Sequence, residues 1–184
     1  MTLIKLGKVV AKVLEVFHWV AAALMAAAAI CSVAASEKIG YFVSLDAKDC
    51  CGAELAVYGF EVHAPVAGGS VDMTVFGLFA IGAVILLALM AMVFRNLHLI
   101  LRNSETAGPF HKDNIRMLRE IGIFSIAVPV IGLLMSVVLR LAVGVDTAEI
   151  SVSQSGVFMG IIVLCLTQCF IYGAKLESDV DGLL

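Results

Sequence analysis

The stretch "MTVFGLFAIGAVILLALMAMVF", residues 73–94, contains no charged side chain. A helix rises about 1.5 Å per residue, so this stretch is long enough to cross the ~30 Å hydrocarbon core of a bilayer. Three more apolar blocks, at about 13–35, 121–143 and 155–173, meet the same length requirement. The sequence therefore predicts an all-α membrane protein with four transmembrane helices arranged in two helical hairpins.

The composition of the whole chain agrees with this fold class. The chain has 184 residues, of which 61% are hydrophobic and only 15% charged, and its mean hydropathy is +1.05. A soluble domain of this length carries a more polar surface. The four blocks fill nearly half of the chain and leave no room for a separate soluble catalytic domain. We therefore expect a single integral membrane domain, 1–184. Its first block is too long for the hydrophobic core of a signal peptide and is interpreted as a transmembrane helix.

Basic residues in the short connections predict the orientation of the helices. The first helix is preceded by Lys5, Lys8 and Lys12, and five bases lie in the connection 95–120: Arg95, Arg102, Lys112, Arg116 and Arg119. The loop 36–72 holds two lysines against six acids. This asymmetry predicts an N-in/C-in topology, with 36–72 outside and with the connection 95–120 and the acidic tail 174–184 in the cytoplasm. Arg140 does not follow this pattern, and we expect it to reach the outer headgroups or to pair with Asp146 or Glu149.

The outer loop 36–72 contains two segments rich in β-forming residues. These are "GYFVSL" (40–45) and "LAVYGFEV" (55–62), and the turn-like "DAKDCCGAE" (46–54) separates them. The pattern predicts a small extracytoplasmic β-hairpin with Cys50 and Cys51 at its tip. Two interpretations of these cysteines stay open: unpaired or variably oxidised thiols, or a redox-sensing or metal-binding tip.

Two features inside the apolar blocks predict local helix geometry. Pro129 removes a backbone donor from the third helix and is expected to kink it. The spacing Gly156-x-x-x-Gly160 in the fourth helix permits close contact with a neighbouring helix.

The segment "GPFHKDNIRMLREIG", residues 108–122, joins the second and third predicted helices. Pro109 suits a first helical turn, and Asp113 complements the helix dipole. A basic stripe forms where Lys112, Arg116 and Arg119 recur at i, i+4 and i+7. Next to this stripe lies a face with Ile115, Leu118 and Gly122. We expect a short interfacial helix that continues directly into the third transmembrane helix. Its stripe has two compatible interpretations: contact with the anionic inner leaflet, at about 1 kcal/mol per base, or docking of a cytoplasmic partner.

This segment also resembles the signature of the DUF2975 (YoaS-like) family of bacterial four-helix integral membrane proteins. The resemblance rests on the Pro-Phe pair, on Asn114 and on the Leu-Arg-x-x-Gly step, together with the ending "YGAKLESDVDGLL" (172–184). His111 departs from the family pattern, which has a small hydroxyl residue there. The resemblance implies a multi-pass protein of the bacterial cytoplasmic membrane without established catalytic residues. It also implies a genetic association with small helix-turn-helix regulators.

Three rival functions were weighed against these patterns. A transporter needs polar groups at the membrane midplane, and the candidates are Ser125, Ser136, Thr167 and Gln168. Haem would need facing ligands, for which the candidates are His18, His98 and Cys169. No phosphate loop, HExxH motif or nucleophile elbow predicts an enzyme, and no cofactor or metal is expected.

The function that the sequence favours is a non-catalytic regulatory or sensory membrane partner of a small cytoplasmic DNA-binding regulator. In this hypothesis Lys112, Arg116 and Arg119 contact the partner, while Phe110 and Ile115 position the interfacial helix. Asn114 belongs to the same candidate partner- or lipid-binding surface. An outer signal at Cys50 and Cys51 would reach them through the third helix and Pro129. Direct nucleic-acid binding is not expected, because no helix-turn-helix core lies outside the four spans. Homo-oligomerisation stays open.

Overall fold

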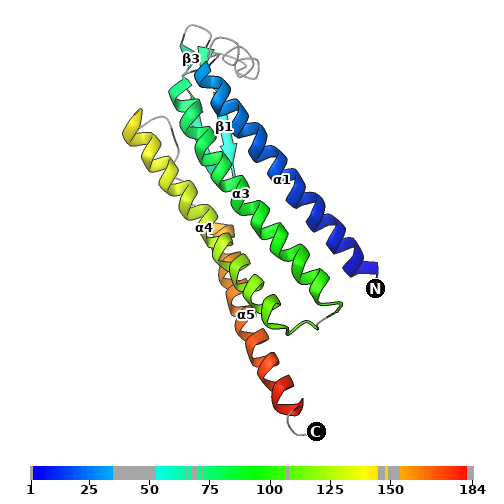
Figure 1. Cartoon of the computed structure of the whole chain (residues 1–184). Coiled ribbons are helices and arrows are strands. Elements are labelled where there is room, and N and C mark those ends of the chain that lie inside the picture. Colours follow the sequence, from blue (N-terminus) through cyan, green and yellow to red (C-terminus); the bar gives the residue numbers. More distant parts are fainter. Residues whose placement is uncertain are drawn as a thin grey trace. The chain divides into compact units, whose positions relative to one another are not determined.

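Four long helices dominate the computed structural model, which describes residues 2–34, 53–64, 66–67, 70–71, 73–106, 108–144, 148 and 154–181. Figure 1 shows α1 (Thr2–Ala34), α3 (Met73–Asn103), α4 (Lys112–Ala142) and α5 (Gln154–Asp181). The short strands are β1 (Ala53–Val57), β2 (Phe60–Ala64), β3 (Val66–Ala67) and β4 (Ser70–Val71). All four helices are long and apolar enough to cross a membrane. The length and composition of these helices therefore confirm the prediction of four helices that can cross a membrane.

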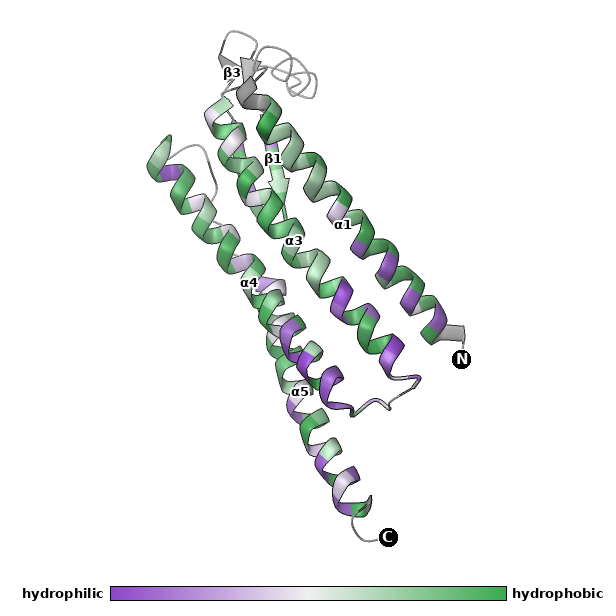
Figure 2. Ribbon diagram, in the orientation of Figure 1, coloured by the Kyte–Doolittle hydropathy of each residue, from purple (hydrophilic) through white to green (hydrophobic). Residues whose placement is uncertain are grey.

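The helices are longer than the spans expected from hydropathy. α1 has 33 residues, and α3 and α4 have 31 each, which corresponds to about 50 and 46 Å. Polar residues gather at the start of α1, the end of α3 and the start of α4 (Figure 2). The connection 95–120 is therefore mostly helical, since α3 continues to Asn103 and α4 begins at Lys112. The tail is also helical as far as Asp181. Helical hydrogen bonds satisfy the backbone in water as well as in lipid, so the apolar block does not set where a helix ends.

The chain forms two compact units, which differ in what they bury. Unit 1 contains Met1–His18, Leu89–Ala127 and Gln154–Leu184, and unit 2 contains Trp19–Ala88 and Val128–Ser153. Unit 2 buries a mainly apolar core, in which Ser136 is the buried polar residue among those described. The buried polar side chains described in unit 1 are Glu15, His18, Asn96, Asn114 and Thr167. Buried polar groups need specific partners, so unit 1 is the part of the chain where a functional site is best sought.

A β-hairpin forms in unit 2, but not where the sequence placed it. β1 and β2 pair antiparallel and end in the register Val57↔Phe60. Tyr58 and Gly59 make the turn with φ of 50° and 83°, and two positive φ values are what a type I′ turn requires. The prediction of a single strand over 55–62 is therefore wrong, because this segment contains the turn. The prediction of a tip at Cys50 and Cys51 is wrong for this hairpin, and both cysteines and 40–45 lie outside the described residues.

The first residue of β2, Phe60, is packed between α3 and α4 within unit 2. Phe60 is fully buried and stacks on Phe79, with ring centroids 5.4 Å apart. A Cβ at Gly82 would lie 2.9 Å from Phe60 Cε1, and one at Gly132 would lie 3.7 Å from Phe60 Cβ. The two glycines therefore make room for the Phe60 ring.

The chain between α4 and α5 is joined to the same hairpin. Val62 forms an antiparallel bridge with Ala148, and Arg140 Nε donates a hydrogen bond of 2.6 Å to the Ala148 carbonyl. Arg140 thus stabilises the backbone of the α4–α5 connection. Its expected partners Asp146 and Glu149 lie outside the described residues.

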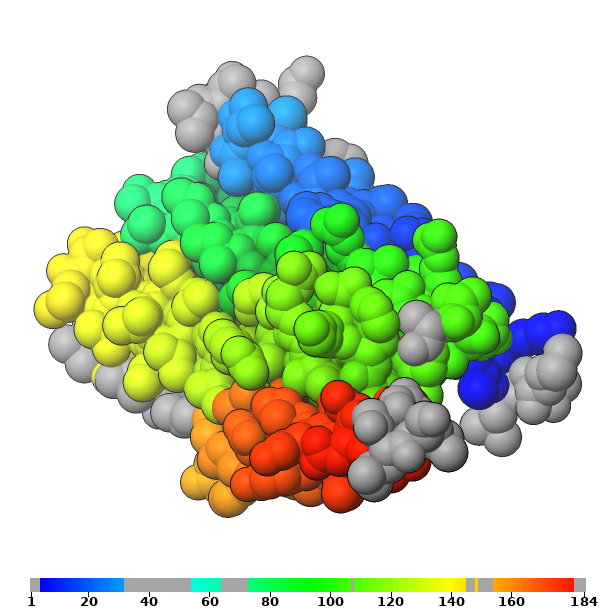
Figure 3. All heavy atoms as spheres, turned by 60° about the horizontal axis from the view of Figure 1, so that its bottom comes forward, coloured from blue at the N-terminus to red at the C-terminus, as the bar shows by residue number. Residues whose placement is uncertain are grey.

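In unit 1, α4 and α5 approach each other at two glycines. A Cβ at Gly122 would lie 3.2 Å from the Gly160 carbonyl oxygen, and one at Gly160 would lie 2.8 Å from the Gly122 carbonyl oxygen. Figure 3 shows the orange and red atoms of α5 against the yellow-green first half of α4. The predicted close contact is therefore confirmed for Gly160. Pro129 is buried inside α4, which continues on both sides of it, and the kink stays a prediction.

Candidate functional site

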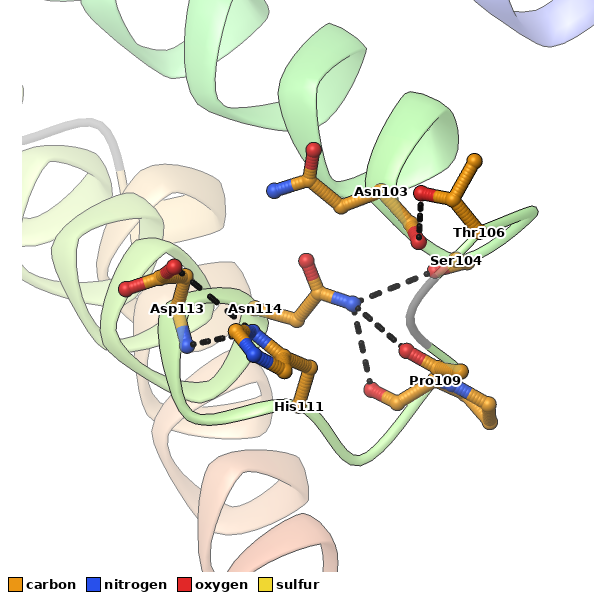
Figure 4. Close-up of polar contacts among 8 residues, drawn as sticks. Asn103, Ser104, Thr106, Pro109, His111, Asp113 and Asn114 are labelled. Carbon is orange, nitrogen blue, oxygen red and sulfur yellow. Dashed lines mark hydrogen bonds and ion pairs between the residues drawn. The ribbon is translucent and has the colours of Figure 1, made fainter.

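The turn between α3 and α4 is held by one buried amide, that of Asn114. Its Nδ2 donates to Ser104 Oγ at 3.4 Å, to the Gly108 carbonyl at 3.1 Å and to the Pro109 carbonyl at 3.4 Å. Figure 4 shows these three contacts converging on the Asn114 side chain. Asn114 is only 1% exposed, and its Oδ1 has no hydrogen-bond partner among the described residues. Asn114 therefore stabilises the turn from its buried side.

The sequence analysis placed Pro109 in the first turn of this helix, but α4 begins three residues later, at Lys112. Gly108 has a φ of 82°, so the chain turns there before the helix starts. The carbonyl of His111 accepts the first helical hydrogen bonds, from the backbone N–H groups of Asn114 and Ile115. His111 Nδ1 also accepts a bond of 3.3 Å from the Asp113 N–H (Figure 4). His111 thus caps the helix, because it supplies an acceptor to an N–H group that has no partner within the helix.

Phe110 attaches the same turn to α5. Its ring lies 5.4 Å from that of Phe170, at an interplanar angle of 58°. A Cβ at Gly173 would lie 2.6 Å from Phe110 Cε1, so the ring fits against α5 where no side chain stands. This agrees with the positioning role expected of Phe110. The sequence analysis did not identify Phe170 and Gly173 as partners of Phe110, although their i, i+3 spacing places them on one face of a helix.

The three cations of the predicted stripe are exposed on the first turns of α4. We call Lys112, Arg116 and Arg119 the basic surface. Arg116 Nε lies 3.6 Å from Glu120 Oε1, with the Arg116 side chain 68% exposed, and such a pair contributes about 0–1 kcal/mol. Lys112 and Arg119 form no ion pair with any residue that the structure describes. The basic surface is therefore available to an acidic group, while the half-buried Ile115 lies beside it.

Glu120 connects the basic surface to the interior of unit 1. Its Oε2 accepts a hydrogen bond of 2.9 Å from Nδ2 of the buried Asn96 on α3. This contact holds α3 and α4 together one to two turns from the loop. The signal for this contact in the sequence is weak, because Asn96 is simply a polar residue near the end of a mostly apolar helix.

The end of α3 is also tied to α1 in unit 1. Lys8 Nζ lies 2.6 Å from Glu105 Oε2, and His98 Nδ1 lies 3.1 Å from the Lys8 carbonyl oxygen. The hydrogen bond from Lys8 lowers the pKa of Glu105 below its ordinary value, and the positive charges of Lys8 and Lys5 act in the same direction. The carboxylate is thus kept ionised beside the start of α1.

His18 and Thr167, two of the residues considered for rival functions, make local contacts. His18 Nδ1 lies 2.7 Å from the Leu14 carbonyl oxygen, and its ring packs on Phe94 at 5.0 Å. Thr167 donates to the Val163 carbonyl at 2.8 Å, whereas Ser136 Oγ is buried with no partner among the described residues. Within the described ranges, no group of three or more His, Cys, Asp or Glu is placed to hold a metal ion.

Comparison with family models, with curated proteins and with solved structures finds no significant match to this chain.

The role of Asn114 predicts a local loss of structure in Asn114→Ala. The substitution removes the donor to Ser104 and to the Gly108 and Pro109 carbonyls, and a typical hydrogen bond within a protein contributes about 0.5–1.5 kcal/mol to stability. We expect trypsin to cleave purified protein in detergent faster after Arg102 and Lys112, which flank the turn. Asn103→Ala is the matched control, since no hydrogen bond of its side chain is seen within the described residues. Equal cleavage of the two variants would contradict the role assigned to Asn114.

Proposed function

We propose that this chain is a non-catalytic membrane protein whose basic surface docks a small cytoplasmic DNA-binding regulator. One observation carries this proposal: Lys112, Arg116 and Arg119 are exposed at the start of a 31-residue helix. The contacts of Asn114 and Phe110 hold that helix start in place. A rigid base preserves the geometry of a binding surface and reduces the ordering cost of association.

The charges around the basic surface favour a partner with an acidic patch. Glu177 and Asp179 are exposed on α5. Among the described residues, no ion pair joins these acids to the basic surface. Lys112 and Arg119 thus keep their charge free of any acid that the structure describes, and complementary charge on a partner would speed its association.

The proposal includes an orientation and a location for the protein. The basic residues near the ends of α1, α3 and α4 support a cytoplasmic position for both termini and for the α3–α4 turn. The resemblance of 108–122 and 172–184 to DUF2975 proteins supports the cytoplasmic membrane of a bacterium. It also supports a helix-turn-helix protein as the partner, with this chain in a regulatory or sensory role.

The test is a crosslinked pull-down from native membranes with wild type and Arg116→Ala/Arg119→Ala. We expect the wild type to recover a small helix-turn-helix protein that the double variant loses. The recovered protein, once purified, should bind the wild type in nanodiscs less tightly as salt rises, because salt screens exposed charges.

Arg95→Ala/Lys175→Ala is the matched control, because it removes two exposed cations of unit 1 that lie outside the basic surface. All variants must first insert at normal levels. Recovery of the same partner by Arg116→Ala/Arg119→Ala would overturn the docking site, as would the absence of any specific partner of the wild type. The basic surface would then be a lipid anchor.

A further inference from the structure

A second basic site lies in unit 1, in a groove between α1 and α3 that the proposed function does not use. The groove has a volume of about 360 Å³ and is lined by Lys8, Val9, Lys12, Val13, His98 and Arg102. We call it the α1–α3 groove. It combines cationic and apolar walls, and such a combination suits an amphipathic ligand.

The cations of the groove are only partly neutralised. Lys8 pairs with Glu105 at 2.6 Å and Lys12 with Glu15 at 3.0 Å, but the Lys12 side chain remains 52% exposed. Arg102 is exposed, and its side chain forms no hydrogen bond or ion pair with any described residue. A guanidinium has donors that fit a phosphate in pairs, and Lys12 has further donors beyond the one facing Glu15. The groove therefore presents donors suited to an anion.

The apolar wall of the groove decides which kind of anion fits. Val9 and Val13 are each 60% exposed and stand one turn apart on a helix that is apolar enough to cross a membrane. A water-soluble phosphate compound would leave both valines in contact with water. A lipid acyl chain covers them, at a gain of about 25 cal/mol per Å² of apolar surface buried.

Close contact between α1 and α3 holds the two walls of the groove together. A Cβ at Gly7 would lie 3.2 Å from Leu101 Cδ1, so α1 approaches α3 where it has no side chain. His98 Nδ1 reaches the Lys8 carbonyl at 3.1 Å. These contacts hold the walls at a set distance before any ligand arrives, which reduces the cost of binding.

We propose that the α1–α3 groove binds one anionic phospholipid. The lipid phosphate contacts Arg102 and Lys12, and an acyl chain lies along Val9 and Val13. Basic pockets between transmembrane helices are suited to anionic headgroups. This site is separate from the basic surface on α4 and does not depend on the docking of a regulator.

The experiment measures lipids bound to the purified full-length protein by native mass spectrometry. Phosphatidylglycerol and phosphatidylcholine are supplied in equal amounts in the detergent. We expect one retained phosphatidylglycerol per chain in the wild type. In Lys12→Gln/Arg102→Gln its affinity should fall about 10- to 30-fold, given about 1 kcal/mol for each base near an anionic lipid. Arg116→Gln/Arg119→Gln, the matched control on the basic surface, should bind as the wild type does.

Three outcomes would overturn the proposal. The first is equal retention of the two lipids by the wild type, and the second is an equal loss of lipid in the control variant. The third is displacement of the lipid by glycerol 3-phosphate at the same concentration, which would assign the groove to a soluble phosphate compound. Failure of the regulator pull-down would not change any of these lipid-binding results. The two proposals can therefore fail independently.

Discussion

Replacing Gly160 by alanine will separate α4 from α5 in unit 1 and lower the thermal stability of the protein. A Cβ at this position would lie 2.4 Å from Ile126 Cγ1, 2.8 Å from the Gly122 carbonyl oxygen and 3.1 Å from the Ile126 nitrogen. Two of these three atoms belong to the backbone of α4, so a change of rotamer cannot remove the clash. The helices themselves must move apart.

The expected loss is large for a single methyl group because of how membrane helices associate. Lipid chains are as apolar as the helix faces, so association depends on close packing and not on the hydrophobic effect. Overpacking a close contact costs about 1–3 kcal/mol. The loss should be seen as a lower temperature at which the detergent-solubilised protein ceases to elute as a monodisperse peak after heating.

Gly77→Ala provides the matched control for this substitution. Gly77 lies in α3, and a Cβ there would meet no atom within 4 Å. Alanine is favoured over glycine in a helix by about 0.8–1 kcal/mol, so this variant should be as stable as the wild type or more so. If Gly160→Ala and Gly77→Ala lost their monodisperse peak at the same temperature, the α4–α5 contact described above would be wrong.

The second large effect is expected for Phe60→Ala in unit 2. The Phe60 ring is fully buried between α3 and α4 and stacks on Phe79. Truncation of a buried Phe to alanine costs about 3–5 kcal/mol, because the removed atoms leave a cavity. The thermal stability in detergent should fall by more than in any other single variant proposed here. Phe158→Ala is the control, since this ring on α5 is 62% exposed.

A double substitution tests the position of the Phe60 ring directly. In the wild type, Gly82→Ala should destabilise the protein, because the new Cβ would lie 2.9 Å from Phe60 Cε1. In the Phe60→Ala background the same methyl group enters the space that the ring has left, so the loss should shrink or change sign. Additive effects of Phe60→Ala and Gly82→Ala would show that the two residues are not in contact.

The four helices and the continuity of α4 were predictable from the sequence. Each apolar block is long enough to cross a bilayer, and this property requires no knowledge of the neighbouring elements. The spacing of Lys112, Arg116 and Arg119 likewise predicted that the connection would continue into the third transmembrane helix. α4 runs without a break from Lys112 to Ala142 and confirms it. Local hydrogen bonding and side-chain periodicity are enough to produce both features.

The β-hairpin shows where such local reasoning failed. Tyr-Gly is a less obvious turn than Asn-Gly, because tyrosine has no preference for the positive φ that Tyr58 adopts. The segment 55–62 therefore reads as a continuous strand. The tertiary structure places Phe60 in a space that Gly82 and Gly132 leave open. Burial of this ring favours the turn at Tyr58–Gly59, and a sequence pattern does not contain that information.

What the sequence by itself determined, then, is the set of helices and the exposed charges on them, because chain length, apolar content and helical spacing are local properties. Only the tertiary structure decided which polar residues are buried and which lie together. Asn114 is recognised as the centre of a turn only once α3 and α4 are in place. The α1–α3 groove joins Lys8 to His98, 90 residues along the chain. Contacts between such distant residues depend on how helices pack, and packing is decided by the shapes of all facing side chains together.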